Sequence, residues 1–134
     1  VTSTRLAAGL VSAEIAGNAG PASTGAYTTA AGAWLRYDTG VDGTAFWRAV
    51  TSDATTATVT TTAASIAANT SYELVVEVNS AGTAVRFWVN GVLVATHTAH
   101  LPATSTALGC TARLRTLAAA ARALRLGRMT WSSL

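Results

Sequence analysis

The chain contains no lysine and few charged residues of either sign. Charged residues make up 11% of its 134 positions, whereas an average soluble domain has about 25%. All nine basic residues are arginine, and the formal net charge is +3. Thr, Ser, Ala and Gly must therefore cover most of the surface, and low charge gives little protection against self-association. The composition favours a subunit of a packed assembly over a freely diffusing enzyme.

Cysteine and long apolar runs are also scarce. Cys110 is the single cysteine, which excludes an intrachain disulfide and a cysteine metal cluster. No stretch approaches 18 consecutive apolar residues, so we expect no membrane insertion. We recognise no secretory signal, and the first residue is Val rather than Met, so a processed chain and the C-terminal part of a longer protein both stay open. The hydrophobic content of 50% predicts one domain over residues 1–134.

Arginines are concentrated near the C-terminus, and the chain is basic, with a pI of about 9.8. Five of them lie within a short stretch: Arg113, Arg115, Arg122, Arg125 and Arg128. A basic protein can bind nucleic acid through such charges. These arginines alternate with Leu and Ala, however, and no nucleic-acid-binding motif surrounds them. We therefore expect solvated strand faces or subunit contacts, and no nucleic-acid partner.

The clearest pattern is a predicted β-hairpin at residues 84–98. Two runs of strand-forming residues flank Asn90-Gly91, which tolerates the two positive φ angles of a type I′ turn. The two-residue loop predicts four facing pairs: Val89 with Val92, Trp88 with Leu93, Phe87 with Val94, and Arg86 with Ala95. The inner face would then carry Val85, Phe87, Val89, Val92, Val94 and Thr96. The outer face would carry Arg86, Trp88, Leu93, Ala95 and His97, and because it is half apolar we expect something to pack on it.

Further strands are expected before this hairpin. Apolar runs between turn signals predict strands at 4–15, 27–37 and 45–50, and the Thr-rich residues 51–63 predict a polar strand at a sheet edge. Residues 72–78 alternate, with Tyr72, Leu74, Val76 and Val78 inward and Glu73 and Glu77 outward. Residues 72–98 are therefore predicted to form a three-strand meander.

The C-terminal segment has two interpretations. Residues 112–126 are rich in helix formers and could place Leu114, Leu117, Ala121 and Leu124 on one stripe. The alternative is a strand near 110–116, an Ala-rich turn, and a strand at 122–131 with Leu124 and Leu126 inward. We favour the strands, because many short strands at regular spacing indicate a sandwich that a final strand must close. The predicted fold is an all-β antiparallel β-sandwich.

The order of these segments resembles the concanavalin A-like (laminin-G-like) jelly-roll domains of tailed-phage virion proteins. The residues that carry the resemblance are Trp34-Leu35-Arg36-Tyr37-Asp38, Phe46-Trp47-Arg48-Ala49-Val50, Asn69-Thr70-Ser71-Tyr72-Glu73-Leu74, Val85-Arg86-Phe87-Trp88-Val89-Asn90-Gly91, Val94-Ala95-Thr96-His97-Thr98 and Ala123-Leu124-Arg125-Leu126. The resemblance implies a jelly roll and a non-catalytic structural module located in the virion, as a capsid decoration or part of a tail fibre or spike. It also implies assembly with copies of itself and other virion proteins, and attachment to a host-surface glycan.

The chain departs from that family in length. Such domains usually have further strands before the segment at 4–15, so the sandwich would be incomplete at its N-terminus. Either the sheets are smaller, or a neighbouring chain covers them, or the chain is a C-terminal fragment.

Catalytic arrangements are not apparent. Glu73 and Glu77 would lie on one face of one strand, about 13 Å apart at 3.3 Å per residue, whereas glycosidase carboxylates face each other at roughly 5 to 9.5 Å. A cross-strand ion pair with Arg86 is the simpler expectation. His97 and His100 match no zinc or triad spacing and are expected to be surface histidines. We predict no enzyme activity and no cofactor; a small glycoside hydrolase is a remote alternative.

Asp38 and Asp42 flank a Gly-containing loop and are weak candidates for a Ca²⁺ site. The loop lacks the ligand density of a calcium loop, and Asp and Gly are expected turn residues. We therefore predict no metal site.

Aromatic side chains are the best candidates for binding. Six of them could stack on sugar rings, with Arg36 or Arg48 as hydrogen-bond donors: Trp34, Tyr37, Phe46, Trp47, Trp88 and Trp131. The residues we select as ligand or subunit contacts are Trp47, Trp88, Leu93, Arg86, Trp34 and Arg36. For the aromatic residues we favour the alternative, which is packing in the second sheet or against a sister subunit. A secreted carbohydrate-binding module of a larger bacterial enzyme is the second functional hypothesis.

Overall fold

A computed structural model describes residues 4–12, 30–40, 42, 43 and 46–116, together with positions 123, 125, 127, 128 and 130. These residues form eight strands and no helix, which confirms the all-β prediction. Among them, no helix has the length and apolar character that crossing a membrane requires.

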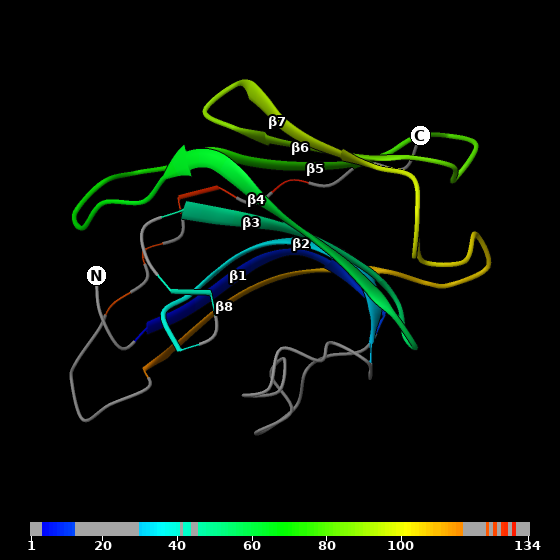
Figure 1. The fold of residues 1–134 in the computed structure, drawn as a ribbon, viewed down its shortest axis with the longest axis horizontal. Helices are drawn as coiled ribbons and strands as arrows, with labels where there is room; N and C mark the ends of the chain where they lie inside the picture. Colours follow the sequence, from blue (N-terminus) through cyan, green and yellow to red (C-terminus); the bar gives the residue numbers. More distant parts are fainter. Residues whose placement is uncertain are drawn as a thin grey trace.

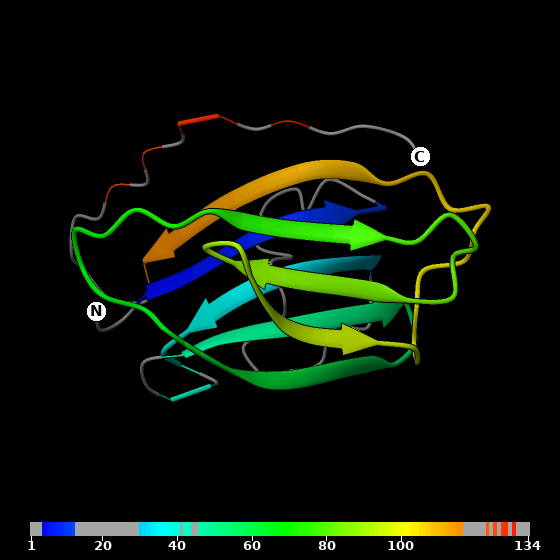
Figure 2. The same cartoon turned by 90° about the horizontal axis from the view of Figure 1, so that it is seen from above.

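The strands form two antiparallel sheets that pack face to face, as in a β-sandwich (Figure 1). The larger sheet has the order β4-β3-β2-β1-β8 and the smaller sheet the order β5-β6-β7. The strand bounds are β1 Thr4–Val11, β2 Ala31–Asp38, β3 Phe46–Asp53, β4 Ala57–Ser65, β5 Leu74–Val78, β6 Val85–Val89, β7 Val92–His97 and β8 Gly109–Thr116. Seen from above, the smaller sheet covers the middle of the larger one (Figure 2).

The N-terminal strands lie where the alternation of residues predicted them. β1, β2 and β3 correspond to the predicted strands at 4–15, 27–37 and 45–50, and β4 is an edge strand, as expected for the Thr-rich segment. β4 begins later than predicted because β3 continues to Asp53. The Asp53 carboxylate then accepts hydrogen bonds from the backbone N–H groups of Thr55 and Thr56 and from the Thr55 hydroxyl. These bonds favour its charged form and lower the pKa of Asp53 to about 2.

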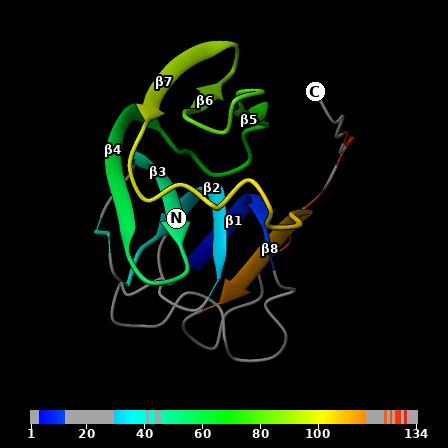
Figure 3. The same ribbon diagram turned by 90° about the vertical axis from the view of Figure 1, so that its right-hand side faces the viewer.

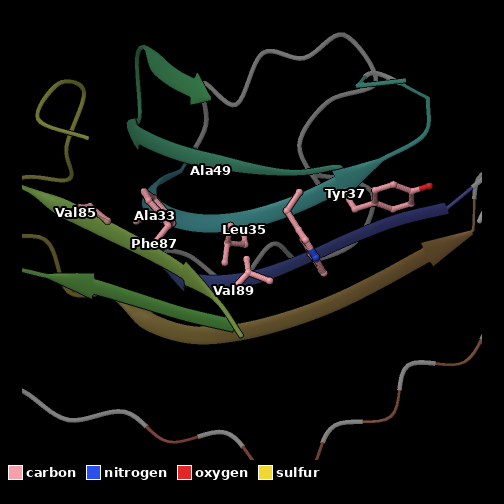
Figure 4. Close-up of a cluster of buried hydrophobic side chains, with 8 residues drawn as sticks. Ala33, Leu35, Tyr37, Ala49, Val85, Phe87 and Val89 are labelled. Carbon is pink, nitrogen blue, oxygen red and sulfur yellow. The ribbon is translucent and has the colours of Figure 1, made fainter. Parts of the chain in front are cut away.

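The core lies between the two sheets (Figure 4). Its buried members come from β2, β3 and β6: Ala33, Leu35, Tyr37, Trp47, Ala49, Val85, Phe87 and Val89. Tyr72, Leu74, Val76 and Val78 pack against this core, which confirms the predicted inward side of the 72–78 segment and the meander β5-β6-β7. A second buried cluster, including Trp34 and Val50, lies on the opposite face of the larger sheet. The larger sheet is therefore buried on both faces, and every residue of β2 is buried.

The hairpin forms at the predicted turn, but its register changes after two pairs. Asn90 and Gly91 both have positive φ, and Val89 pairs with Val92 and Trp88 with Leu93. A β-bulge follows, so Phe87 pairs with Ala95 and Arg86 with Thr96. The predicted pairs of Phe87 with Val94 and of Arg86 with Ala95 are therefore wrong, and so are the faces assigned to several β7 residues.

At the C-terminus, β8 confirms the strand predicted near 110–116 and rules out a helix beginning at residue 112. Most of the second predicted strand, residues 122–131, lies outside the described residues.

Candidate functional site

An apolar row crosses the outer face of the smaller sheet. Val75, Trp88 and Leu93 are register neighbours on β5, β6 and β7. Val75 is 40% exposed and Leu93 is 52% exposed, while Trp88 is half-buried between them. Val92, beside the hairpin turn, is 63% exposed, but it pairs in register with the inward-facing Val89 and therefore lies on the other face of the sheet, as predicted. The structure thus brings together Trp88 and Leu93, as predicted, and adds Val75; we call these three residues the apolar row.

A polar row borders the apolar row on the same face. Glu77 pairs in register with Arg86, and Arg86 with Thr96. The Arg86 and Glu77 side chains form an ion pair at 3.6 Å, which confirms the expected cross-strand pairing. Both side chains are well exposed, so the pair adds little stability. The face as a whole offers large apolar side chains with a charged border.

Trp47 and Trp34 are not on this face. Trp47 is 1% exposed, belongs to the core and packs edge-on against Tyr72. Trp34 is 4% exposed and lies on the opposite face of the larger sheet, beside Val50. Both tryptophans therefore pack within the sheets, and neither presents an exposed ring to a ligand or subunit.

Arg36 is part of a buried charge cluster on that same opposite face. Arg36 and Arg48 are register partners, and Asp42 lies between them. The Asp42 carboxylate accepts a hydrogen bond from Arg36 and lies 3.9 Å from Arg48, which also donates to the Asp42 carbonyl at 2.8 Å. Burial lowers the pKa of Arg36, an effect that the hydrogen bond and charge of Asp42 oppose. Arg36 is 2% exposed, so it does not present a donor to an outside ligand.

Asp38, the other weak calcium candidate, is also engaged by an arginine. Its buried carboxylate accepts a hydrogen bond from Arg5, its register partner on β1, and another from the Gly40 backbone. Asp38, at the end of β2, and Asp42, just after it, therefore serve as counter-ions of arginines. In the part of the chain that the structure describes, no group of three or more His, Cys, Asp and Glu residues could hold a metal ion.

His97 is the residue most displaced from its predicted position. We expected a surface histidine, but the bulge in β7 turns His97 inward, where it is 4% exposed and packs edge-on against Phe87. Its Nδ1 lies 3.0 Å from the Thr51 hydroxyl and its Nε2 lies 2.9 Å from the Thr60 hydroxyl. Burial lowers the pKa of His97. This group connects β7 to β3 and β4 and is the main polar contact between the sheets within the described residues.

Sequence reasoning missed Val75, although a signal for it was present. The alternation of residues 72–78 already placed Val75 on the same face as Glu73 and Glu77. Pairing that strand with the following one would have set Val75 beside Trp88. Nothing in the sequence indicated the bulge that changes the face of β7 beyond Leu93.

Comparison with known proteins gives one family. The model of the SO2946-like, C-terminal domain family matches residues 12–126. Searches of curated proteins and of solved structures return no significant match. Because the family model covers most of the chain, the chain belongs to the SO2946-like C-terminal domain family.

Proposed function

We propose that this domain is a non-catalytic structural module of a tailed-phage virion that acts by subunit assembly through the outer face of its smaller sheet. The apolar row is the observation that carries the proposal. Two aliphatic side chains of this row, Val75 and Leu93, are at least 40% exposed and stand on either side of the Trp88 ring. Contiguous exposed apolar patches of this kind mark interaction surfaces. The low charge of the chain supports the same proposal.

The virion location and the jelly-roll identity belong to this proposal. They rest on the resemblance of the strand order and hairpin sequences to concanavalin A-like virion domains. Partners would be further copies of the chain and other virion proteins, in a capsid decoration or in a tail fibre or spike.

Oligomeric state tests the proposal directly. The change Leu93→Arg places a charge in the apolar row beside Trp88, where burial against a subunit would leave it unpaired. Thr96→Arg is the matched control, because it adds the same charge on the same strand in the polar row. By sedimentation equilibrium, we expect the unchanged chain to self-associate and Leu93→Arg to weaken association about 30-fold or more, while Thr96→Arg has little effect. A chain that stays monomeric, or an association that Leu93→Arg leaves intact, would contradict the proposal.

Glycan attachment is the second candidate function, and it now depends on Trp88 alone among the three candidate tryptophans. Trp88 is half-buried beside the exposed Arg86, a pairing suited to a sugar ring. This arrangement would serve host-surface attachment by a virion protein or a secreted carbohydrate-binding module. Glycan binding that Trp88→Ala abolishes, by a chain that sedimentation shows to be a monomer, would favour the secreted module. Unchanged glycan binding after Trp88→Ala would remove a sugar-binding role for this residue.

A further inference from the structure

The larger sheet ends in two strands that extend beyond the smaller sheet. β4 is its outermost strand on one side, outside β7, and β8 is its outermost strand on the other, outside β5 (Figures 2 and 3). A second copy of the chain that paired beside β5 or β7 would bring its own larger sheet into collision with β8 or β4. Beside β4 or β8, the two larger sheets would instead continue edge to edge. Among the described strands, β4 and β8 are therefore the two edges that leave room for pairing between copies.

Charge distinguishes these two edges. Natural proteins protect sheet edges with charged residues, with proline or by keeping the edge strand short. β4 spans nine residues, Ala57–Ser65, and contains no charged residue and no proline. β8 carries Arg113 and Arg115, so pairing with its own copy would bring like charges together. β4 is therefore the edge that can pair with a copy of itself.

The first half of β4 is regular and open. Between Phe46 and Arg48 of β3 the register shifts, so β4 bulges after Thr61. From Ala57 to Thr61 the pairing with β3 is regular, and Val59 in the middle of this stretch is 44% exposed. Within the described residues, the side of β4 that faces away from β3 has no strand partner. Residues 57–61 therefore offer a regular edge to another strand.

The turn between β3 and β4 shows which backbone groups face this edge. The Asp53 N–H donates to the Thr56 carbonyl at 3.2 Å across the turn. In an antiparallel ladder, pairs that exchange hydrogen bonds alternate with pairs that do not. Counting from Asp53 and Thr56 along the regular register, Thr58 and Thr60 bond to β3. Three residues then direct their N–H and C=O groups away from β3: Ala57, Val59 and Thr61.

We propose that two copies of this chain pair through β4, antiparallel about a two-fold axis at Val59. Each Val59 would face the Val59 of the other copy and exchange both backbone hydrogen bonds with it, and Ala57 would face Thr61 in a pair of the same kind. The two exposed valines would cover each other beside Val50, the register partner of Val59 on β3. The two larger sheets would form one continuous sheet. This contact depends neither on the apolar row nor on a virion location.

Disulfide trapping in the full chain tests this register. In a hydrogen-bonded antiparallel pair, the facing Cα atoms lie about 5.5 Å apart, which a disulfide can span. In a chain that also carries Cys110→Ser, we expect Val59→Cys to give a disulfide-linked dimer after mild oxidation, measured by non-reducing electrophoresis. Thr61→Cys is the matched control on the same face of β4, because its copy in the other chain would lie about 13 Å away at 3.3 Å per residue. No linked dimer from Val59→Cys, or equal yields from the two variants, would overturn the proposal.

Sedimentation equilibrium separates this contact from the apolar row. In the Leu93→Arg chain, we expect the association that remains to be a dimer held by β4. Adding Val59→Lys should weaken this dimer about tenfold or more, because the two lysines would face each other. Adding Thr96→Lys instead, at an exposed position of β7, should leave the dimer unchanged.

The two contacts give different results when one of them is absent. A Leu93→Arg chain that is monomeric at every concentration would overturn the β4 contact while supporting the apolar row. An association that Leu93→Arg leaves intact and Val59→Lys weakens would support the β4 contact and contradict the apolar row.

Discussion

His97 illustrates how one buried side chain fixes its own protonation state. The Thr51 hydroxyl donates its proton to the Ala99 carbonyl at 3.1 Å, so it must accept at its oxygen from His97 Nδ1–H. Nε2 is then unprotonated and accepts from the Thr60 hydroxyl. With a neutral imidazole, both ring nitrogens and both threonine hydroxyls have a hydrogen-bond partner. A proton on Nε2 would instead point at the Thr60 hydroxyl hydrogen, which is already directed at Nε2.

This arrangement predicts a loss of stability in mild acid. Burial lowers the pKa of His97 in the folded chain below the ordinary 6.5. The unfolded chain therefore takes up a proton more readily, and the free energy of unfolding falls as the pH drops below about 6.5. Denaturant unfolding between pH 8 and 5 measures the slope of the free energy of unfolding against pH.

Two variants isolate the contribution of His97. His97→Gln keeps hydrogen-bonding capacity but cannot titrate, so the slope should flatten. His100→Gln is the matched control, because His100 is exposed and bonds to Thr58 at the surface. If the slope is unchanged in His97→Gln, burial of His97 does not cause the loss of stability in acid.

β1 depends on the absence of a side chain at Gly9. A Cβ there would lie 2.3 Å from the Ala33 carbonyl oxygen and 2.5 Å from the Trp34 Cα, both of which are backbone atoms of β2. We expect Gly9→Ala to lower the free energy of unfolding by about 1–3 kcal/mol or more, because the strands must separate to admit the methyl group. Gly109→Ala is the control on β8, where the nearest atom to an added Cβ is 3.9 Å away. Thermal unfolding of both variants measures the difference, and equal stability would contradict the close approach of β1 and β2.

Ion pairs on the two sheets should differ in strength. Asp42 lies between Arg36 and Arg48 with its side chain 9% exposed, and Asp42→Ala would leave two arginines without this counter-ion. We expect a loss of about 3–5 kcal/mol. Glu77→Ala removes the exposed partner of Arg86 and should cost less than about 1 kcal/mol. Similar losses in the two variants, measured by denaturant unfolding, would show that burial does not distinguish these pairs.

The strands themselves were predictable because alternation and turn residues are local signals. Asn90-Gly91 fixed the turn, and the two pairs next to it followed from the loop length. The bulge in β7 depends on how the strand packs over β4, which no local pattern reveals. For that reason the predicted face of His97 was wrong.

The face on which Trp47 lies was not predictable, for a different physical reason. The alternation of β3 offers apolar residues on both faces, with Trp47 and Ala49 on one and Phe46 and Val50 on the other. Because the larger sheet is buried on both faces, alternation alone does not show which side meets the smaller sheet. Phe46 is 40% exposed and Trp47 is buried in the core.

At the scale of the whole molecule, the two outer faces differ in what they offer a partner. The outer face of the larger sheet carries buried charges already matched by aspartates, whereas that of the smaller sheet carries the exposed apolar row. The low charge of the chain leaves little to oppose contact at that row. The proposed subunit contact would cover this apolar row on β5, β6 and β7.

The proposal of a virion subunit is tested most directly by imaging an intact phage particle in search of this chain. A cryo-electron microscopy map that resolves strands would show which face of the domain meets its neighbours. We predict a neighbouring subunit packed over Val75, Trp88 and Leu93. A particle that lacks the chain, or one in which this face is open to solvent, would contradict the account.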